Sequence, residues 1–429
     1  MPVLDAGYWM DTENKDQLLD LGAGLEGWYM PHPNVTLHAR MMERYAQYPA
    51  FLDKRIDSTG FIPHHGKYQK RYRGGYLFPD FQGSLYWQIN DIFALEIGNE
   101  QQFLGEGHRS MLLSDNANSF PYIKGSIQFW NLKYFHQIGL LQDINNHDPG
   151  FHVERKNMAL HYLSWNISES VSLNLFEAIV WRPVDSSYHR GIDPNYFNPV
   201  IFLRPVEYSR GSADNALIGL SGKYRIHNNY TLYGQWIIDE FSLLKTLDDG
   251  TWGGKKYGVQ LGFKAYDILG LKGCNFLIEY NQVRPFTYSH TNSLRNYGNN
   301  YEPLAHPLGS NFIEISTKTI YHYQNWNFSL KIINAQKGEN PKDKNLGGNI
   351  YLNYDTKDSL YGHKLLQGIK TNITYFDIKA SYNLIPKNGI TIEGRLRGRS
   401  ISNLEVKENH LFIEFGIKSI LSGSETFYY

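Results

Sequence analysis

Strict alternation of apolar and polar residues is the feature of this sequence that most limits its fold. Between residues 256 and 265 the apolar side chains take alternate positions, as Tyr257, Val259, Leu261, Phe263 and Ala265. The residues between them are lysine, glycine or glutamine. Because successive side chains of a β-strand point to opposite faces, this pattern predicts a strand with one apolar and one polar face.

Strands of this kind are predicted along the whole chain, and no long amphipathic helix or fixed repeat interrupts them. The seventeen segments lie near 17–30, 34–48, 83–90, 92–100, 122–130, 132–141, 156–166, 170–182, 214–226, 229–241, 254–266, 274–284, 311–323, 326–337, 368–384, 389–400 and 408–420. The fold class is therefore all-β.

The connections between these strands alternate in length. Short turns fall at 90–91, 131, 168–169, 227–229, 324–325 and 386–388. Long connections fall at 49–82, 101–121, 142–155, 183–213, 285–310 and 338–367. Short turns at one end and long loops at the other are typical of an antiparallel transmembrane barrel of the outer membrane.

The number of strands must be even, which adds a further strand to this prediction. Bacterial single-chain barrels have an even number of strands, so the seventeen segments are one short of a barrel of about 18 strands. The alternating residues 3–10 are the best candidate for a first strand, which leaves 422–429 as a tail. The other option is a turn at 422–423 and a last strand that starts at Glu425.

A soluble propeller or a pair of β-sandwiches would also alternate. Glycines and aromatic residues on the apolar face, and many charges on the polar face, favour lipid contact over a packed core. The chain has 42 basic and 42 acidic residues, and this zero net charge argues against a nucleic-acid partner. A single cysteine, Cys274, excludes an intrachain disulfide and a cysteine-rich zinc site.

Signals for export are not visible at the start of the sequence. No stretch reaches the ~18 apolar residues of a transmembrane helix. Met1 is followed by Pro2 and Asp5, without the basic start and apolar segment of a signal peptide. Either the chain is cytoplasmic, or its signal has been removed.

The connection 101–121 is the first candidate site. It combines Gly105 and Gly107, which permit a tight bend, with His108, Arg109, Asp115 and Asn116. We expect a loop folded into the lumen, with Arg109 held by a carboxylate of the wall. The alternative is catalysis, with Glu106 and Asp115 as the acid and base of sugar hydrolysis.

Two further candidate sites lie later in the chain. The connection 183–213 is rich in proline, and its Arg204 and Glu207, followed by Asp214, are candidates for a second loop in the lumen. Arg395, Arg397 and Arg399 lie on one face of a strand. Three like charges in a row need anionic partners, which are either Glu393 and Glu414 or a bound anion.

Motifs of catalysis and of cofactor binding are missing from the sequence. There is no nucleophile elbow, phosphate-binding loop, dinucleotide fingerprint or zinc spacing. His306, before a strand, and the His64–His65 pair, within a basic loop, are better interpreted as hydrogen-bonded loop residues than as metal ligands. We therefore expect neither a catalytic residue, nor a cofactor, nor a bound metal.

Three blocks of the sequence resemble the capsule assembly Wzi family of outer-membrane proteins. They are residues 103–117, residues 198–219 with Arg204, Glu207 and Asp214, and residues 306–312. The version is similar to those of Bacteroidota. The resemblance implies an eighteen-stranded barrel in the outer membrane with a plugged lumen. It also implies a lectin that attaches capsule or exopolysaccharide to the cell surface without catalysis.

The sequence as a whole predicts one barrel domain, residues 1–429, that binds surface polysaccharide. Its other contacts would be lipid or lipopolysaccharide and, potentially, further outer-membrane proteins. Sugar rings would stack on tyrosine and tryptophan of the long loops, while arginine and asparagine bind hydroxyl or acid groups. The alternatives are an oligosaccharide channel or transporter, a subunit of a larger outer-membrane complex, and a soluble β-fold glycoside hydrolase.

Overall fold

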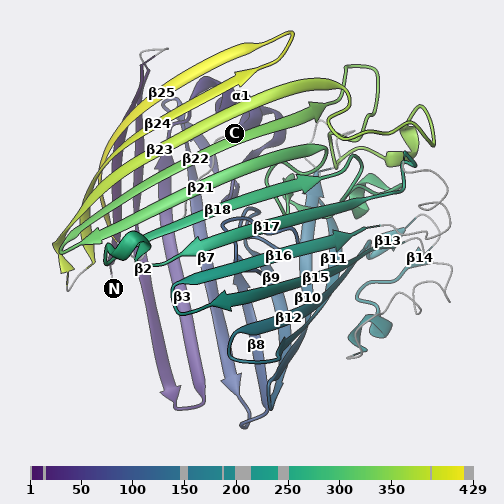
Figure 1. The fold of residues 1–429 in the computed structure, drawn as a ribbon, viewed down its shortest axis with the longest axis horizontal. Coiled ribbons are helices and arrows are strands. Elements are labelled where there is room, and N and C mark those ends of the chain that lie inside the picture. Colours follow the sequence, from purple (N-terminus) through teal and green to yellow (C-terminus); the bar gives the residue numbers. More distant parts are fainter. Residues whose placement is uncertain are drawn as a thin grey trace.

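Eighteen antiparallel strands close into a barrel in the computed structural model, which describes residues 2–12, 16–144, 153–185, 188–198, 214–239, 251–386 and 389–419. Each wall strand pairs with its neighbours along the chain, and the first strand pairs with the last to close the sheet. In Figure 1 the green and yellow strands of the front wall cross the purple and blue strands of the back wall, as tilted strands on opposite sides of a barrel do.

The wall strands are β1 (Pro2–Asp11), β2 (Asp16–His32), β3 (Val35–Ala46), β7 (Gly75–Gln88), β8 (Phe93–Glu100), β9 (Phe120–Phe129), β10 (Leu132–Ile144), β11 (Val153–Asn166), β12 (Val171–Trp181), β15 (Asn215–Ile226), β16 (Tyr230–Ile238), β17 (Tyr257–Ala265), β18 (Cys274–Val283), β21 (Phe312–Tyr323), β22 (Trp326–Glu339), β23 (Ile369–Ile385), β24 (Ile390–Ser402) and β25 (Lys407–Ser419). The all-β barrel and the first strand near residues 3–10 are confirmed. The proposed tail, 422–429, lies outside the described residues.

Shorter elements lie in the long connections and in one turn. They are α1 (Ala50–Thr59), β4 (Phe61–Ile62), β5 (Gly66–Lys67), β6 (Lys70–Tyr72), β13 (Val184–Asp185), β14 (Tyr188–His189), β19 (Gly298–Asn299), β20 (Glu302–Pro303) and the 3-10 turns η1 (Pro194–Phe197), η2 (Ile268–Gly270), η3 (Ser293–Arg295) and η4 (Tyr354–Thr356). None of the helices in the described ranges is long and apolar enough to cross a membrane.

The start of β7 differs from the prediction by eight residues, because this strand begins at Gly75 rather than at 83. Its first residues pair with β3, and the inward-facing Tyr76 and Phe78 are fully buried. They pack in one cluster with Leu52 and Ile56 of α1. Apolar residues face inward here because the lumen holds a helix, so the alternation that marks the other strands is absent.

The two faces of the wall have opposite character. On β17, Leu261 is 60% exposed on the outer face, whereas its neighbour Gln260 is fully buried on the inner face. The outer face of other strands likewise carries exposed large apolar side chains, among them Leu25, Phe81, Ile97, Leu232, Ile315 and Phe415. A soluble protein would bury these residues, so this apolar outer face fits lipid.

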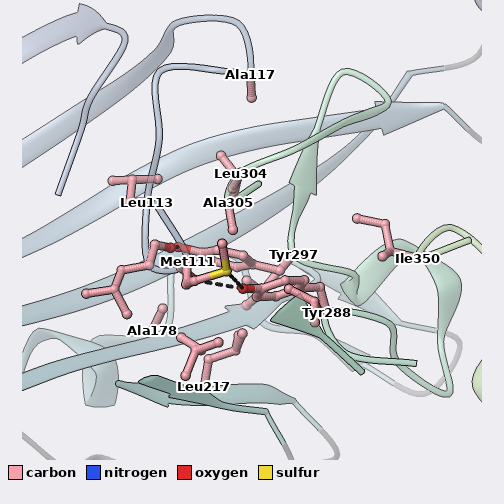
Figure 2. Close-up of a cluster of buried hydrophobic side chains, with 14 of the residues drawn as sticks. Met111, Leu113, Ala117, Ala178, Leu217, Tyr288, Tyr297, Leu304, Ala305 and Ile350 are labelled. Atoms are coloured by element: carbon pink, nitrogen blue, oxygen red, sulfur yellow. Dashed lines mark hydrogen bonds between the residues drawn. The ribbon is translucent and has the colours of Figure 1, made fainter. Parts of the chain in front are cut away.

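The lumen is occupied by chain that folds inward from the long connections. Met111, Leu112 and Leu113, between β8 and β9, are fully buried. They pack in one cluster with Tyr288 and Tyr297, which lie between β18 and β21. Figure 2 shows the two tyrosine rings side by side with Met111 against them, and the Tyr288 hydroxyl donates to the Met111 carbonyl oxygen at 2.8 Å.

Part of the 183–213 connection lies on the outer wall instead. Tyr196 of η1 packs on Trp181 with ring centroids 4.7 Å apart. Trp181 is on the same side of the sheet as Leu140, which is 44% exposed on the outer face. Residues 190–198 therefore cover outward-facing side chains. The prediction that this connection fills the lumen is wrong for these residues. An aromatic surface on the wall holds them there, and the indole nitrogen of Trp181 donates to the Gly191 carbonyl oxygen at 3.1 Å.

This outer strap, residues 190–198, gives a first testable prediction. Trp181→Phe keeps most of the ring area and removes the hydrogen bond to Gly191, which contributes about 1 kcal/mol. We expect trypsin to cleave after Arg190 about fivefold faster, because local opening of the strap becomes more frequent. Trp130→Phe, at an exposed position in a short turn, is the matched control and should leave the rate unchanged. Equal rates in all three proteins would show that the strap does not depend on this contact.

Candidate functional site

Polar side chains of the barrel wall hold the 101–119 plug loop in the lumen. Gln235 accepts from the Met111 backbone amide at 2.6 Å and donates to the Leu104 carbonyl oxygen at 3.0 Å. Gln260 donates to the Arg109 carbonyl oxygen at 2.8 Å. The wall thus supplies hydrogen bonds to backbone groups that lose water when the loop enters the lumen.

Two wall carboxylates complete the anchoring of the plug loop. Glu279 accepts from the backbone amides of His108 and Arg109 at 3.0 and 3.2 Å. Glu314 lies 3.6 Å from Arg109 Nε. Glu314 also accepts from Asn281 at 3.2 Å, and its Oε1 lies 2.9 Å from Nε2 of His306. Arg109, Glu314, Asn281 and His306 are buried, so the Arg109–Glu314 pair is a buried ion pair within a hydrogen-bonded network.

The two glycines of the plug loop lie where a larger residue would not fit. A Cβ atom at Gly105 would collide with the side-chain amide of Gln235, and Gly105 has a φ of +146°. A Cβ atom at Gly107 would collide with the Glu279 carboxylate. The glycines therefore permit the close approach of the loop to its anchors on the wall.

The carboxylates of the catalytic alternative lie in different surroundings. Glu106 pairs with Lys223 at 2.7 Å and Lys264 at 3.6 Å, near the short turns. Asp115 is exposed, and the neighbouring Asn116 donates to the Pro303 carbonyl oxygen at 3.1 Å, near the long loops. Nothing in this arrangement places the two carboxylates across a shared substrate position.

The arginine row on β24 is neutralised by protein carboxylates. Arg395 Nε donates to Asp377 at 2.8 Å, Arg397 donates to Glu414 at 2.9 Å, and Arg399 donates to Glu408 at 3.1 Å. Of the two partners that the sequence offered, Glu414 takes this role. Glu393 instead pairs with Lys418 at 2.7 Å.

Of the remaining predicted residues, the structure describes only Asp214. Arg204 and Glu207 lie outside the described residues. Asp214 accepts from Arg190 and from the Tyr196 hydroxyl, each at 2.6 Å, so it belongs with the outer strap. Within the described ranges, no group of three or more histidine, cysteine, aspartate or glutamate side chains could hold a metal ion.

A cavity at the long-loop end is the site that sequence reasoning missed. This mouth cavity has a volume of about 790 Å³, and α1, the end of β22, and the loops 284–311 and 340–368 contribute to its lining. Its lining includes four cationic side chains, those of Arg55, Lys337, Lys342 and Lys344. It includes two carboxylates, those of Glu339 and Asp343. Its size lies within the ~300–1,000 Å³ of common ligand pockets.

An aromatic pair forms one side of the mouth cavity. The rings of Tyr301 and Tyr351 stack with centroids 4.2 Å apart. Burial, followed by the nearby carboxylates of Asp143 and Glu302, raises the pKa of Tyr351 well above its ordinary value, so its hydroxyl stays neutral. That hydroxyl is buried and has no hydrogen-bond partner in the part of the chain that the structure describes. Lys337, which also lines the mouth cavity, forms no ion pair with the described residues.

A closed antiparallel barrel with an apolar outer face defines an outer-membrane type of β-barrel protein. No protein-family model and no curated protein matches the sequence. Among solved structures, the chain is similar to Wzi of Escherichia coli, an outer-membrane protein involved in group 1 capsule assembly and described as a carbohydrate-binding β-barrel. The TM-score is 0.58 at 13% identity, covering 97% of this chain and 83% of that one.

Two channels of Pseudomonas aeruginosa also match, at lower scores. OprD gives a TM-score of 0.49 at 9% identity, covering 97% of this chain and 93% of that one. OccK1 gives a TM-score of 0.49 at 10% identity, covering 97% of this chain and 96% of that one. Of these three barrels, Wzi has a TM-score above 0.5, and its 13% identity shows a similar fold and no more. The resemblance found in the sequence is thus supported at the level of the fold.

Proposed function

We propose that this protein is an outer-membrane lectin that binds surface polysaccharide, capsule or exopolysaccharide, and catalyses no reaction. The observation that carries the proposal is the mouth cavity above a filled lumen. Its cationic excess favours acidic sugars, because exposed ammonium and guanidinium groups attract carboxylate and other acid groups. The stacked tyrosines offer an amphipathic surface for a sugar ring.

The comparison with Wzi supports this proposal in one respect. A barrel of similar fold is described as carbohydrate-binding and takes part in capsule assembly. Membership of the capsule assembly Wzi family, and a source among Bacteroidota, are part of the same proposal. Long loops face the cell exterior in outer-membrane barrels, so the mouth cavity would open toward the polysaccharide layer.

An experiment on polysaccharide retention tests the proposal. Lys337→Gln removes one cation of the mouth cavity, and we expect about fivefold weaker retention of acidic exopolysaccharide from the source cells. Lys272→Gln, in the short turn between β17 and β18, removes the same charge far from the cavity and should have no effect. Retention should fall with added salt because screening weakens exposed charge contacts. Polysaccharide length should not change.

Two results would count against the lectin. Equal retention by wild type and Lys337→Gln would show that the mouth cavity does not bind the polysaccharide. Loss of polysaccharide length that disappears in Glu106→Gln would make the protein a hydrolase.

A gated oligosaccharide channel is the second candidate. One observation favours it: a second cavity enters the barrel from the short-turn end and reaches the plug loop at Glu106. The plug loop would have to move for a solute to pass from one cavity to the other. Conductance across a planar bilayer separates the two candidates, since a lectin with a fixed plug conducts little.

A further inference from the structure

The short-turn end of the barrel contains a chamber that the proposed function does not use. Its outer part has a volume of about 770 Å³ and is lined by residues of four short turns and the strands that they join. A smaller recess of about 130 Å³ continues inward to Gly105 and Glu106 at the tip of the plug loop. The two parts share lining residues, namely Glu106, Asn166, Ser172 and Lys223.

Hydroxyl and amide groups dominate the lining of this chamber. They belong to serine, threonine, asparagine and glutamine of β11, β12, β15, β16 and the adjoining short turns. Ser172 and Thr231 are only 4% and 9% exposed. Their hydroxyl groups, and the Asn166 amide, form no side-chain hydrogen bond with the described residues. Asn166 is exposed and all three side chains line the chamber, so these groups are available to a ligand or to water.

Three of the four charges that line the chamber are engaged by protein groups. Glu106 is held by Lys223 and Lys264, as described above. Arg225 donates to the Glu169 carbonyl oxygen at 2.6 Å. Two acidic and two basic residues line the outer part, so the lining has no formal net charge. The formal charge of the lining therefore favours neither an acidic nor a basic ligand.

Tyrosine rings complete the chamber. Tyr162 and Tyr233 line the recess, and Tyr266 lines the outer part. Hydroxyls and amides around tyrosine rings match the chemistry of an uncharged sugar, which presents hydroxyl groups at its edge and C–H groups on its face. We infer that this chamber is a second binding site, which takes an uncharged oligosaccharide from the side of the short turns.

The test uses the purified full-length barrel in detergent and three neutral hexasaccharides, namely maltohexaose, cellohexaose and mannohexaose. Calorimetry or saturation-transfer NMR measures the affinity of each. We expect at least one of them to bind. Ser172→Phe, which fills the chamber, should weaken that binding at least tenfold. Thr231→Val keeps the side-chain volume and removes one hydroxyl, so about threefold to tenfold weaker binding is expected.

The control variant keeps this test separate from the lectin proposal. Lys337→Gln alters only the mouth cavity and should leave hexasaccharide binding unchanged. Heat-modifiable migration on gels confirms that each variant forms a barrel, and Thr231→Val decides the outcome if Ser172→Phe does not assemble. Three results would overturn the inference: none of the sugars binds, binding is equal in wild type and Thr231→Val, or Lys337→Gln abolishes it.

Discussion

Replacement of Arg109 by alanine is expected to release the plug loop. Arg109 is 3% exposed, and its partner Glu314 is fully buried in the network with His306 and Asn281. Loss of one member leaves the other charge buried with less compensation, which costs about 3–5 kcal/mol in comparable buried pairs. We expect a lower melting temperature and frequent opening events in planar-bilayer recordings, where the wild type stays nearly closed.

The matched control is an arginine pair at the surface. Arg71 lies 2.6 Å from Asp57, and both side chains are 45% exposed. Exposed pairs of this kind contribute about 0–1 kcal/mol, so Arg71→Ala should change neither melting nor conductance. Arg109→Ala combined with Glu314→Gln should recover part of the lost stability, because the buried negative charge is removed too. An Arg109→Ala variant that melts and conducts like the wild type would show that the ion pair does not hold the plug loop.

A lysine at position 261 is expected to impair assembly of the barrel. Leu261 lies at the middle of β17 on the outer face. A charge near the centre of the lipid-facing band of such barrels costs about 2–4 kcal/mol. We therefore expect Leu261→Lys to reduce the heat-modifiable, folded fraction in lipid vesicles and to lower the urea concentration at the midpoint of unfolding.

The control for Leu261→Lys is a lysine on the inner face. Asn174 of β12 lines the polar recess and donates to Ser221 at 3.0 Å, so a lysine there would extend into a space open to water. Asn174→Lys should fold like the wild type. Similar losses in the two variants would mean that the outer face is not in lipid.

The sequence alone determined the strands, because a strand needs only a local pattern. Alternation at 256–265 indicates which side chains of β17 face the lumen and which face lipid, and this pattern is local to the strand. The alternation of short and long connections then predicted a barrel. The requirement for an even number of strands placed the first strand at residues 3–10. The prediction was wrong at the start of β7. There Tyr76 and Phe78 pack against α1, a helix 16 or more residues earlier in the chain.

The sequence also indicated the plug loop, because glycines beside charged residues mark a bend that needs partners. It did not identify those partners. Gln235, Gln260, Glu279 and Glu314 come from strands more than 100 residues further along the chain, and only closure of the barrel brings them to Arg109.

Only the tertiary structure decided where the long loops go. A loop sequence does not say whether it enters the lumen, as 284–311 does, or covers the outer wall, as 190–198 does. That choice depends on which wall surface offers matching contacts. The mouth cavity, which Lys337 and the stacked tyrosines line, and the chamber around Ser172 are likewise formed by distant segments. Their residues are unremarkable in sequence, since a cavity is a relation between surfaces and no local pattern records it.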